Sequence, residues 1–407
     1  MEISSIDYDT IIIGAGLAGL SSAYELKDKK VLMLEKNDYL GGRILTKKKN
    51  GVTYELGALL AYEPSQLPFK MESSRLIREE GGVGVSFKGS IIHGETVFAV
   101  IMDILERLEN EDVGIVNAER KNVLEDIKNA LFNVIHSGER KEYLDIRKQD
   151  AFITWPTDHF IGGNTELIDA FLKHISASIE LGVAVSSVRD VGDRVIVVYR
   201  KGKINLRTHA KAVVIATPAT VAKNILETSI TESLDFLKTV RYGSGKVIVL
   251  CLSNVQLIDV RYVVTPYQKM NTIFKSRSEK PGFIVLTIYY SLKEKDELCK
   301  LSDKDLCLLT LKEINQTGIG KILEKNIVFF DVHSWAVLST IIDESYLKWS
   351  QECGRPTQRI FLTGDYMQWK EDQIPYGINA AINNGLDTGR IAKAMLDAED
   401  FQCIKSI

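Results

Sequence analysis

The sequence predicts an α/β fold in which a domain with a parallel sheet is interleaved with a second domain of mixed sheet and helices. Three observations lead to this prediction. Residues 10–34 have the pattern of a strand, a helix and a second strand, whereas residues 73–147 have helical periodicity. Strand patterns then return in the middle of the chain and near its end, with no internal repeat and no low-complexity linker.

The N-terminal unit is the clearest element. Residues 10–13 are a β-branched run that ends at a glycine turn, residues 17–27 have the pattern of a helix, and residues 31–34 form a second apolar strand closed by Glu35. A strand, a helix and a strand within about thirty residues make a βαβ unit, and such units form parallel sheets. Residues 50–60 are expected to be irregular.

The rest of the chain alternates helical and strand-like stretches. Residues 97–108 and 123–135 space apolar residues three and four apart, which predicts two packed helices. Further helices are expected at 306–314 and 378–396, and further strands at 183–188, 195–199, 212–216, 247–252, 263–265, 283–290 and 359–363. These patterns predict one domain from residues 1–70, 150–235 and 350–400, and a second from 71–149 and 236–349.

Composition excludes several classes of protein. Of the 407 residues, 45% are hydrophobic and 26% are charged, which is typical of a globular protein. Lys and Arg total 51 against 54 Asp and Glu, so no basic field is available for a nucleic-acid backbone. The five cysteines form no Cys-x-x-Cys pair, and no cysteine–histidine set has metal-ligand spacing. We expect a cytoplasmic protein without a metal, a signal peptide or a transmembrane segment.

The strongest local motif follows the first strand and reads Gly14-Ala15-Gly16-Leu17-Ala18-Gly19. Gly14 permits a tight turn, Gly16 lets the backbone approach a pyrophosphate, and Gly19 permits close packing of helix on strand. The helix N-terminus supplies free N–H groups for the phosphates. Glu35 ends the second strand, where a carboxylate can bind ribose hydroxyls. The sequence predicts a dinucleotide site, and this motif alone does not separate FAD from NAD.

The next segment does separate them. Residues 40–46 read Leu-Gly-Gly-Arg-Ile-Leu-Thr, which resembles the Gly-Gly-Arg-x-x-Ser/Thr element of the FAD-dependent amine oxidase superfamily. The resemblance implies that Gly41 and Gly42 bring backbone close to the cofactor and that Arg43 faces its phosphates or the flavin. A guanidinium can form paired hydrogen bonds to phosphate. The first domain is then a Rossmann-like FAD-binding domain, and the second is the substrate domain.

Other segments extend this resemblance over about half of the chain. Gly364 and Asp365 match the superfamily's final Gly-Asp turn, whose acid binds the ribityl chain, and Ile378 begins the helix that faces the flavin pyrimidine. Gly57 and Ala58 match an early element that is usually a pair of glycines, and Val188 matches the strand that touches adenine. Departures from the pattern are Ala58, Asn379 in place of a glutamate and Ala380 in place of a glycine.

The resemblance also implies oxidation of a C–N bond in a small molecule, with hydride transfer to flavin N5 and with oxygen or another electron acceptor. Lys246 matches a lysine that lies near N5 in the superfamily. An exposed lysine at the start of a strand would give the same sequence pattern. Trp335 resembles a tryptophan upstream of the last FAD strand, and Tyr376 is next to the position where amine oxidases often keep a tyrosine. No cysteine stands where covalent flavin attachment is expected, so the FAD is expected to be non-covalent.

Three alternatives remain open at this point. The superfamily includes protoporphyrinogen oxidases and carotenoid desaturases, and Gly377, which stands where the tyrosine would be, favours such oxidation of a hydrophobic substrate. Ala58 and Asn379 leave room for an FAD-binding protein without turnover. An NAD-only dehydrogenase is disfavoured by Arg43 and Asp365. The oligomeric state is left open.

Overall fold

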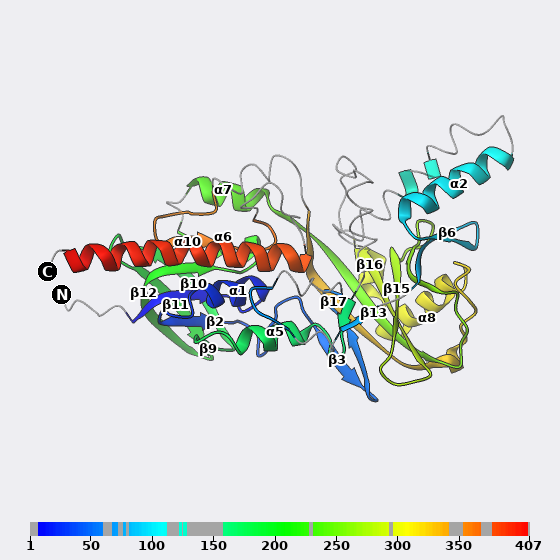
Figure 1. Cartoon of the computed structure of the whole chain (residues 1–407), viewed down its shortest axis with the longest axis horizontal. Coiled ribbons are helices and arrows are strands. Elements are labelled where there is room, and N and C mark those ends of the chain that lie inside the picture. The colour runs from blue at the N-terminus through cyan, green and yellow to red at the C-terminus, as the bar shows by residue number, and fades with distance from the viewer. Residues whose placement is uncertain are drawn as a thin grey trace. The chain divides into compact units, whose positions relative to one another are not determined.

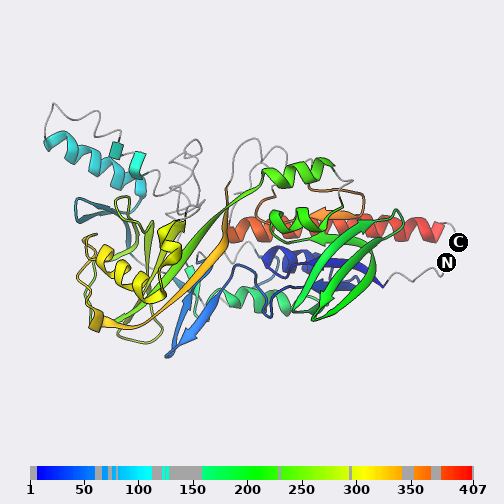
Figure 2. The same cartoon turned by 180° about the vertical axis from the view of Figure 1, so that it is seen from behind.

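The computed structural model describes residues 7–59, 67–71, 76–78, 81–111, 122, 123, 125–127, 158–227, 231–292, 296–341, 353–367 and 377–405. It confirms the α/β class, and the chain divides into two compact units (Figures 1 and 2). The first unit comprises Met1–Leu45, Thr165–Arg241 and Ile342–Ile407, and the second comprises Thr46–Asn164 and Tyr242–Ile341. The assignment of these units to cofactor and substrate stays a prediction.

The first unit is built on a seven-stranded sheet in which five parallel strands end at one edge. The parallel order is β9 (Ser178–Glu180), β2 (Val31–Leu34), β1 (Tyr8–Ile13), β12 (Ile204–Ile215) and β18 (Ile360–Leu362). The antiparallel strands β10 (Val183–Asp190) and β11 (Val195–Lys201) extend the sheet from β12. β2 is apolar and fully buried, and β1 is buried from Thr10 to Ile13, which is typical of a parallel sheet covered on both faces.

Helices of the first unit pack closely against one another. Figure 1 shows α10 (Gly377–Lys405) along one side of α1 (Leu17–Glu25) and α5 (Thr165–Leu172) along the other. The backbones of α1 and α10 approach closely, because a β-carbon at Gly385 would collide with the Ala18 carbonyl oxygen. The Ser22 hydroxyl donates to the Gly385 carbonyl oxygen at 2.9 Å. Two further helices of this unit are α6 (Ala219–Ile225) and α7 (Thr231–Thr239).

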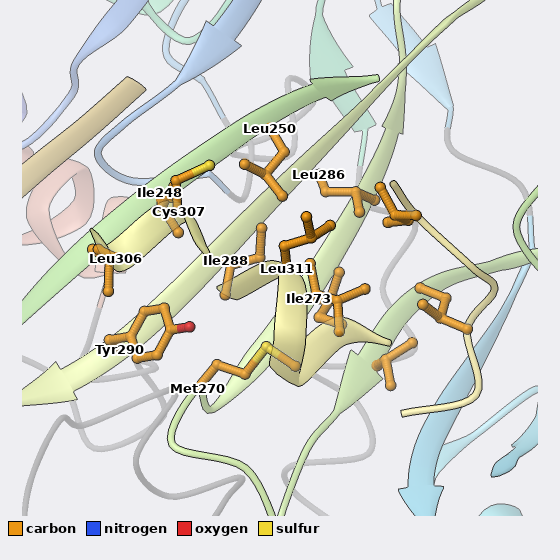
Figure 3. Packing of buried hydrophobic residues seen from close by; sticks show 14 of the residues in the cluster. Ile248, Leu250, Met270, Ile273, Leu286, Ile288, Tyr290, Leu306, Cys307 and Leu311 are labelled. Carbon is orange, nitrogen blue, oxygen red and sulfur yellow. The ribbon is translucent and has the colours of Figure 1, made fainter. Parts of the chain in front are cut away.

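The second unit is a seven-stranded mixed sheet with a helix packed on one face. Figure 3 shows its core, in which Ile248, Leu250 and Ile288 from the strands pack with Leu306 and Leu311. The two leucines belong to α8 (Asp303–Ile314), whose N-terminus is capped by the Ser302 hydroxyl. The strands are, in spatial order, β17 (Ile327–Ile341), β13 (Arg241–Ser253), β16 (Phe283–Leu292), β15 (Thr272–Arg277), β14 (Val260–Val264), β6 (Gly82–Phe87) and β7 (Ser90–Gly94).

Smaller elements complete the second unit. The strands β3 (Thr46–Lys49) and β4 (Val52–Glu55) form a hairpin whose two turn residues, Asn50 and Gly51, both have positive φ. A second pair is formed by β5 (Leu76–Arg78) and β8 (Asp158–Phe160), and α2 (Val97–Glu111) packs on β6 and β7. Single 3-10 turns lie at Glu297–Lys300 and Glu324–Asn326. Within the described ranges, no helix is both long enough and apolar enough to cross a membrane.

The structure corrects several sequence-based expectations. Residues 50–60 are not simply irregular, because β4 occupies part of them, and the helical stretch 73–147 also contains β5, β6 and β7. Strands β15 and β17 were not predicted. The β6 sequence Gly-Val-Gly-Val-Ser-Phe has a weak local strand preference, and its pairing comes from β7 and from the distant β14. The predicted helix 123–135 lies mostly outside the described residues.

Candidate cofactor-binding site

The carboxyl ends of the parallel strands bring four loops of the first unit together. Gly14 follows β1, Glu35 follows β2, Thr217 follows β12 and Gly364 follows β18. Ligands of open α/β sheets bind at this edge, where neighbouring connections run in opposite directions from a central strand. Here the central strand is β1, which lies between β2 and β12.

The first glycine turn has the geometry that the motif predicts. Gly14 has φ +101°, and a β-carbon there would lie 2.8 Å from the Ala216 carbonyl oxygen. A β-carbon at Gly19 would collide with the Gly14 carbonyl oxygen, so Gly19 permits the helix to pack on the strand. Gly16 is the N-cap of α1, and no side chain caps this helix. The first N–H groups of α1 are therefore available to an anion.

The second glycine turn packs directly on the first. Gly41 and Gly42 both have positive φ, and the Gly41 N–H donates to the Ala15 carbonyl oxygen at 2.9 Å. A β-carbon at Gly42 would lie 3.3 Å from the Gly16 Cα. The structure therefore brings together the two glycine segments that the sequence predicts to bind the cofactor.

Glu35 is buried at the end of β2, and its two carboxylate oxygens accept backbone hydrogen bonds. Oε2 accepts from the Ala15 N–H at 2.7 Å, and Oε1 accepts from the Asn37 N–H at 2.9 Å. These bonds fix the carboxylate against the glycine turn. Each oxygen has a further lone pair, so the group can still accept a hydrogen bond from a ribose hydroxyl.

Arg43 and Asp365 come from opposite ends of the chain and form a bidentate ion pair. The Nη1 and Nη2 atoms of Arg43 lie 2.9 and 2.6 Å from the two Asp365 oxygens. The Asp365 side chain is 5% exposed and that of Arg43 is 32% exposed. Both residues are predicted cofactor ligands, and the structure places them in contact with each other.

The C-terminal helix is attached to the Gly364 turn. The Asn384 side-chain amide donates to the Gly364 carbonyl oxygen at 2.9 Å and also to that of Met367. Ile378, in the first turn of α10, is buried. Val188 is buried in β10 opposite Val197, at the predicted adenine strand.

These features fit an adenine dinucleotide. The uncapped start of α1 and the side-chain-free backbone at Gly16 suit a pyrophosphate. Two hydroxyl oxygens at the same strand ends, those of Thr217 and Thr363, are buried and have no hydrogen-bond partner within the described parts of the chain. Buried polar groups are normally paired, so these hydroxyls are consistent with a polar ligand at this edge.

The other predicted site residues that the structure describes lie in the second unit, where side chains donate hydrogen bonds to the carbonyl oxygens of residues 56, 57 and 58. Trp335 Nε1 donates to the Leu56 carbonyl oxygen at 2.7 Å, and the Tyr289 hydroxyl donates to that of Gly57 at 2.8 Å. The Asn164 amide donates to the Ala58 carbonyl oxygen at 2.6 Å. Sequence reasoning did not single out Tyr289 or Asn164, because their contacts join segments far apart in the chain.

Lys246 is 6% exposed and its ammonium donates to the Leu301 carbonyl oxygen at 3.2 Å. Lys246 lies two and four residues before Ile248 and Leu250 in β13, so the three side chains leave the sheet on the same face. That face is covered by α8. The lysine is therefore buried rather than exposed, and its predicted role near the flavin stays a prediction. Tyr376 lies outside the described residues.

Two family profiles match the chain. An NAD(P)-binding Rossmann-like domain matches residues 12–68, and the flavin-containing amine oxidoreductase family matches residues 126–387. The chain belongs to the flavin-containing amine oxidoreductase family. It is accordingly a flavin-dependent oxidoreductase, as the glycine and Gly-Gly-Arg segments predict.

Relatives in sequence and solved structures of similar fold are also found. An L-amino acid oxidase of Cerastes cerastes is 22% identical over 91% of this chain and 86% of its own length. A pseudooxynicotine dehydrogenase of Pseudomonas sp. is 46% identical, over a stretch that spans only 13% of this chain and 11% of that relative. Cyclohexylamine oxidase from Brevibacterium oxydans IH-35A has a TM-score of 0.72 at 16% identity, over 97% of this chain and all of that structure. A candidate protoporphyrinogen oxidase from Exiguobacterium sp. 255-15 has a TM-score of 0.71 at 15% identity, over 97% and 100%.

Proposed function

We propose that this member of the flavin-containing amine oxidoreductase family binds FAD non-covalently and oxidises a C–N bond of a small amine. The observation that supports the cofactor most directly is the contact between the two glycine turns beside the uncapped N-terminus of α1. When bound, the flavin would supply hydride acceptance at N5. The protein would supply binding, orientation and charge.

The residues of the first unit would divide this binding among them. The Gly14–Gly19 turn and the start of α1 would hold the pyrophosphate, and Glu35 would accept from the adenosine ribose. Asp365 would accept from the ribityl chain, and Arg43 would orient that carboxylate while facing the phosphates or the flavin. The N-terminus of α10 at Ile378 would place its positive dipole end against the flavin pyrimidine.

Relatives support an amine as the substrate. The L-amino acid oxidase and the cyclohexylamine oxidase are both named for C–N substrates. Oxygen or another small acceptor would receive the electrons. The cytoplasmic location expected from cysteine usage belongs to the same proposal.

A second candidate is oxidation of a hydrophobic ring or polyene. Gly377 begins α10 with φ +76°, a conformation that disfavours the tyrosine often found there in amine oxidases. The likeness to the candidate protoporphyrinogen oxidase fits this second reading. An FAD-binding protein without turnover is the remaining outcome.

The experiment that tests the proposal follows flavin absorbance without oxygen. Purified protein, reconstituted with FAD, is mixed with a panel of primary amines, amino acids and polyamines, and separately with reduced porphyrins and polyenes. Amine oxidation predicts bleaching of the flavin band by at least one amine and by no member of the hydrophobic panel. Bleaching by the hydrophobic panel alone would establish the second candidate, and bleaching by neither would contradict both.

A further inference from the structure

Glu55 is a buried carboxyl that the proposed function does not use. It ends β4, is 5% exposed, and accepts hydrogen bonds from its hairpin partner Thr46 and from the distant Asn164. The Thr46 hydroxyl lies 2.9 and 3.0 Å from its two oxygens, and the Asn164 backbone N–H donates to Oε1 at 2.6 Å. Among the described Lys, Arg and His side chains, none forms an ion pair with Glu55.

The two partners of Glu55 lie at the points where the chain changes unit. The second unit begins at Thr46 and its first segment ends at Asn164. One carboxyl therefore connects the residue by which the chain enters this unit to the residue by which it leaves. Packing is tight here, because a β-carbon at Gly163 would lie 2.7 Å from Glu55 Oε1 and 2.9 Å from Thr46 Oγ1.

The same cluster extends to the loop that follows Glu55. The Asn164 backbone is held by Glu55, and its side-chain amide donates to the carbonyl oxygens of Ala58 and Leu59 at 2.6 and 3.3 Å. Thr46 stands three residues after Arg43, and Gly57 stands two residues after Glu55. The carboxyl is thus bonded next to both segments that are proposed to hold the flavin.

We infer that Glu55 is a positioning residue for the cofactor, which fixes the Gly57–Ala58 segment through Asn164 and the start of β3, three residues after Arg43, through Thr46. This inference rests on the proposed function. A carboxylate accepts both the O–H and the N–H bond at once, whereas an apolar side chain of similar size accepts neither. Loss of the carboxyl would leave the Thr46 hydroxyl and the Asn164 backbone N–H without this acceptor.

The test compares Glu55→Leu and Glu55→Gln with a matched control. Glutamine can still accept from the Asn164 N–H through its carbonyl oxygen and donate to the Thr46 hydroxyl oxygen. Glu313 is a second buried glutamate of the same unit, and it accepts from the backbone N–H groups of Lys269 and Met270. Glu313→Leu therefore removes a similar buried carboxyl that is not bonded to Thr46 or Asn164.

The readouts are the Kd for FAD, from titration of apoprotein, and the visible circular dichroism of the bound flavin. Glu55→Leu should raise the Kd at least tenfold and change the flavin spectrum, Glu55→Gln should stay within threefold of the parent, and Glu313→Leu should leave both unchanged. Thr46→Val, which deletes one hydroxyl, should raise the Kd a few-fold and supplies the test where Glu55→Leu does not fold.

The inference is overturned by a folded Glu55→Leu or Thr46→Val protein with parental Kd and spectrum, or by an equal loss in Glu313→Leu. Parent protein that binds no FAD would instead contradict the proposed function itself, so the two failures are distinguishable.

Discussion

At the scale of single residues, Gly16 and Gly19 differ in what their missing side chains leave room for. Apart from its chain neighbours, the described residues place no atom closer than 3.8 Å to a β-carbon at Gly16, whereas a β-carbon at Gly19 collides with the Gly14 carbonyl oxygen. Gly16→Ala should therefore fold with parental stability and bind little FAD, because the new methyl group occupies the proposed pyrophosphate position. Gly19→Ala should unfold at lower temperature even as apoprotein. Thermal melts and flavin content check both, and full flavin in a Gly16→Ala protein would refute the placement.

The ion pair between Arg43 and Asp365 predicts a coupled effect on stability. Arg43→Ala removes the guanidinium that pairs with the buried Asp365 carboxylate, so apoprotein should lose about 1–3 kcal/mol of unfolding free energy, since Arg43 is partly solvated. FAD should also be lost on dialysis. Adding Asp365→Asn removes the buried carboxylate charge, so the double variant should be more stable than the sum of the single effects. Urea unfolding measures this, and simple additivity would show that the pair carries no net interaction.

Glu55 predicts a pH dependence of stability. Burial raises its pKa from 4.5 to about 7, against the opposing hydrogen bonds from Asn164 and Thr46. Between these two values the unfolded chain loses a proton that the folded chain keeps, so the free energy of unfolding should fall as pH rises from 4.5 to 7, by up to about 3 kcal/mol. Glu55→Gln should abolish this component. Parallel pH profiles for the two proteins would contradict the assignment.

At the scale of elements, the sequence was sufficient where local pattern and local structure coincide. The unit β1–α1–β2, strand β18 and helices α8 and α10 follow from apolar runs and glycine turns that are adjacent in the chain. The second sheet was predicted less well, because β17 carries Asp331, His333 and Ser334 among its apolar residues. Its pairing with β13, not its composition, makes it a strand.

The candidate site shows the same division. Gly14, Gly16 and Glu35 were predictable because a turn and a strand end lie next to them. The contact of Arg43 with Asp365 spans 322 residues, and no local pattern reports it. The hydrogen bonds of Trp335 and Tyr289 to the carbonyl oxygens of Leu56 and Gly57 were missed for the same reason.

The packing of α1 against α10 predicts a sharp response to added volume. A methyl group at Gly385 would collide with the Ala18 carbonyl oxygen and lie 2.8 Å from the Ser21 Cβ. Gly385→Ala should therefore cost about 1–3 kcal/mol despite the better helix propensity of alanine. The exposed Ala394 on the same helix provides the control, and Ala394→Ser should change stability by about 0.5 kcal/mol or less. A Gly385→Ala protein as stable as the parent would contradict the close approach.

At the scale of the whole molecule, substitution of Lys246 tests whether a residue of the second unit affects the reactivity of the flavin. Lys246→Met keeps the apolar stem and deletes the charge. With the lysine near N5, FAD should stay bound while reoxidation of the reduced flavin by oxygen slows at least tenfold, about 1.4 kcal/mol of barrier. Lys275→Met is the control, because Lys275 also donates to a backbone carbonyl in this unit. Parental reoxidation would leave Lys246 only its contact with Leu301.

The proposed function depends most on non-covalent FAD held by the glycine turns at the carboxyl edge of the first sheet. The direct measurement is to denature purified, FAD-incubated protein with acid and to identify and count the flavin in the supernatant and in the pellet. We predict about one FAD per chain in the supernatant, none in the pellet, and almost none from folded Gly16→Ala protein. FMN in place of FAD, flavin retained on the polypeptide, or equal FAD from the Gly16→Ala variant would contradict the account.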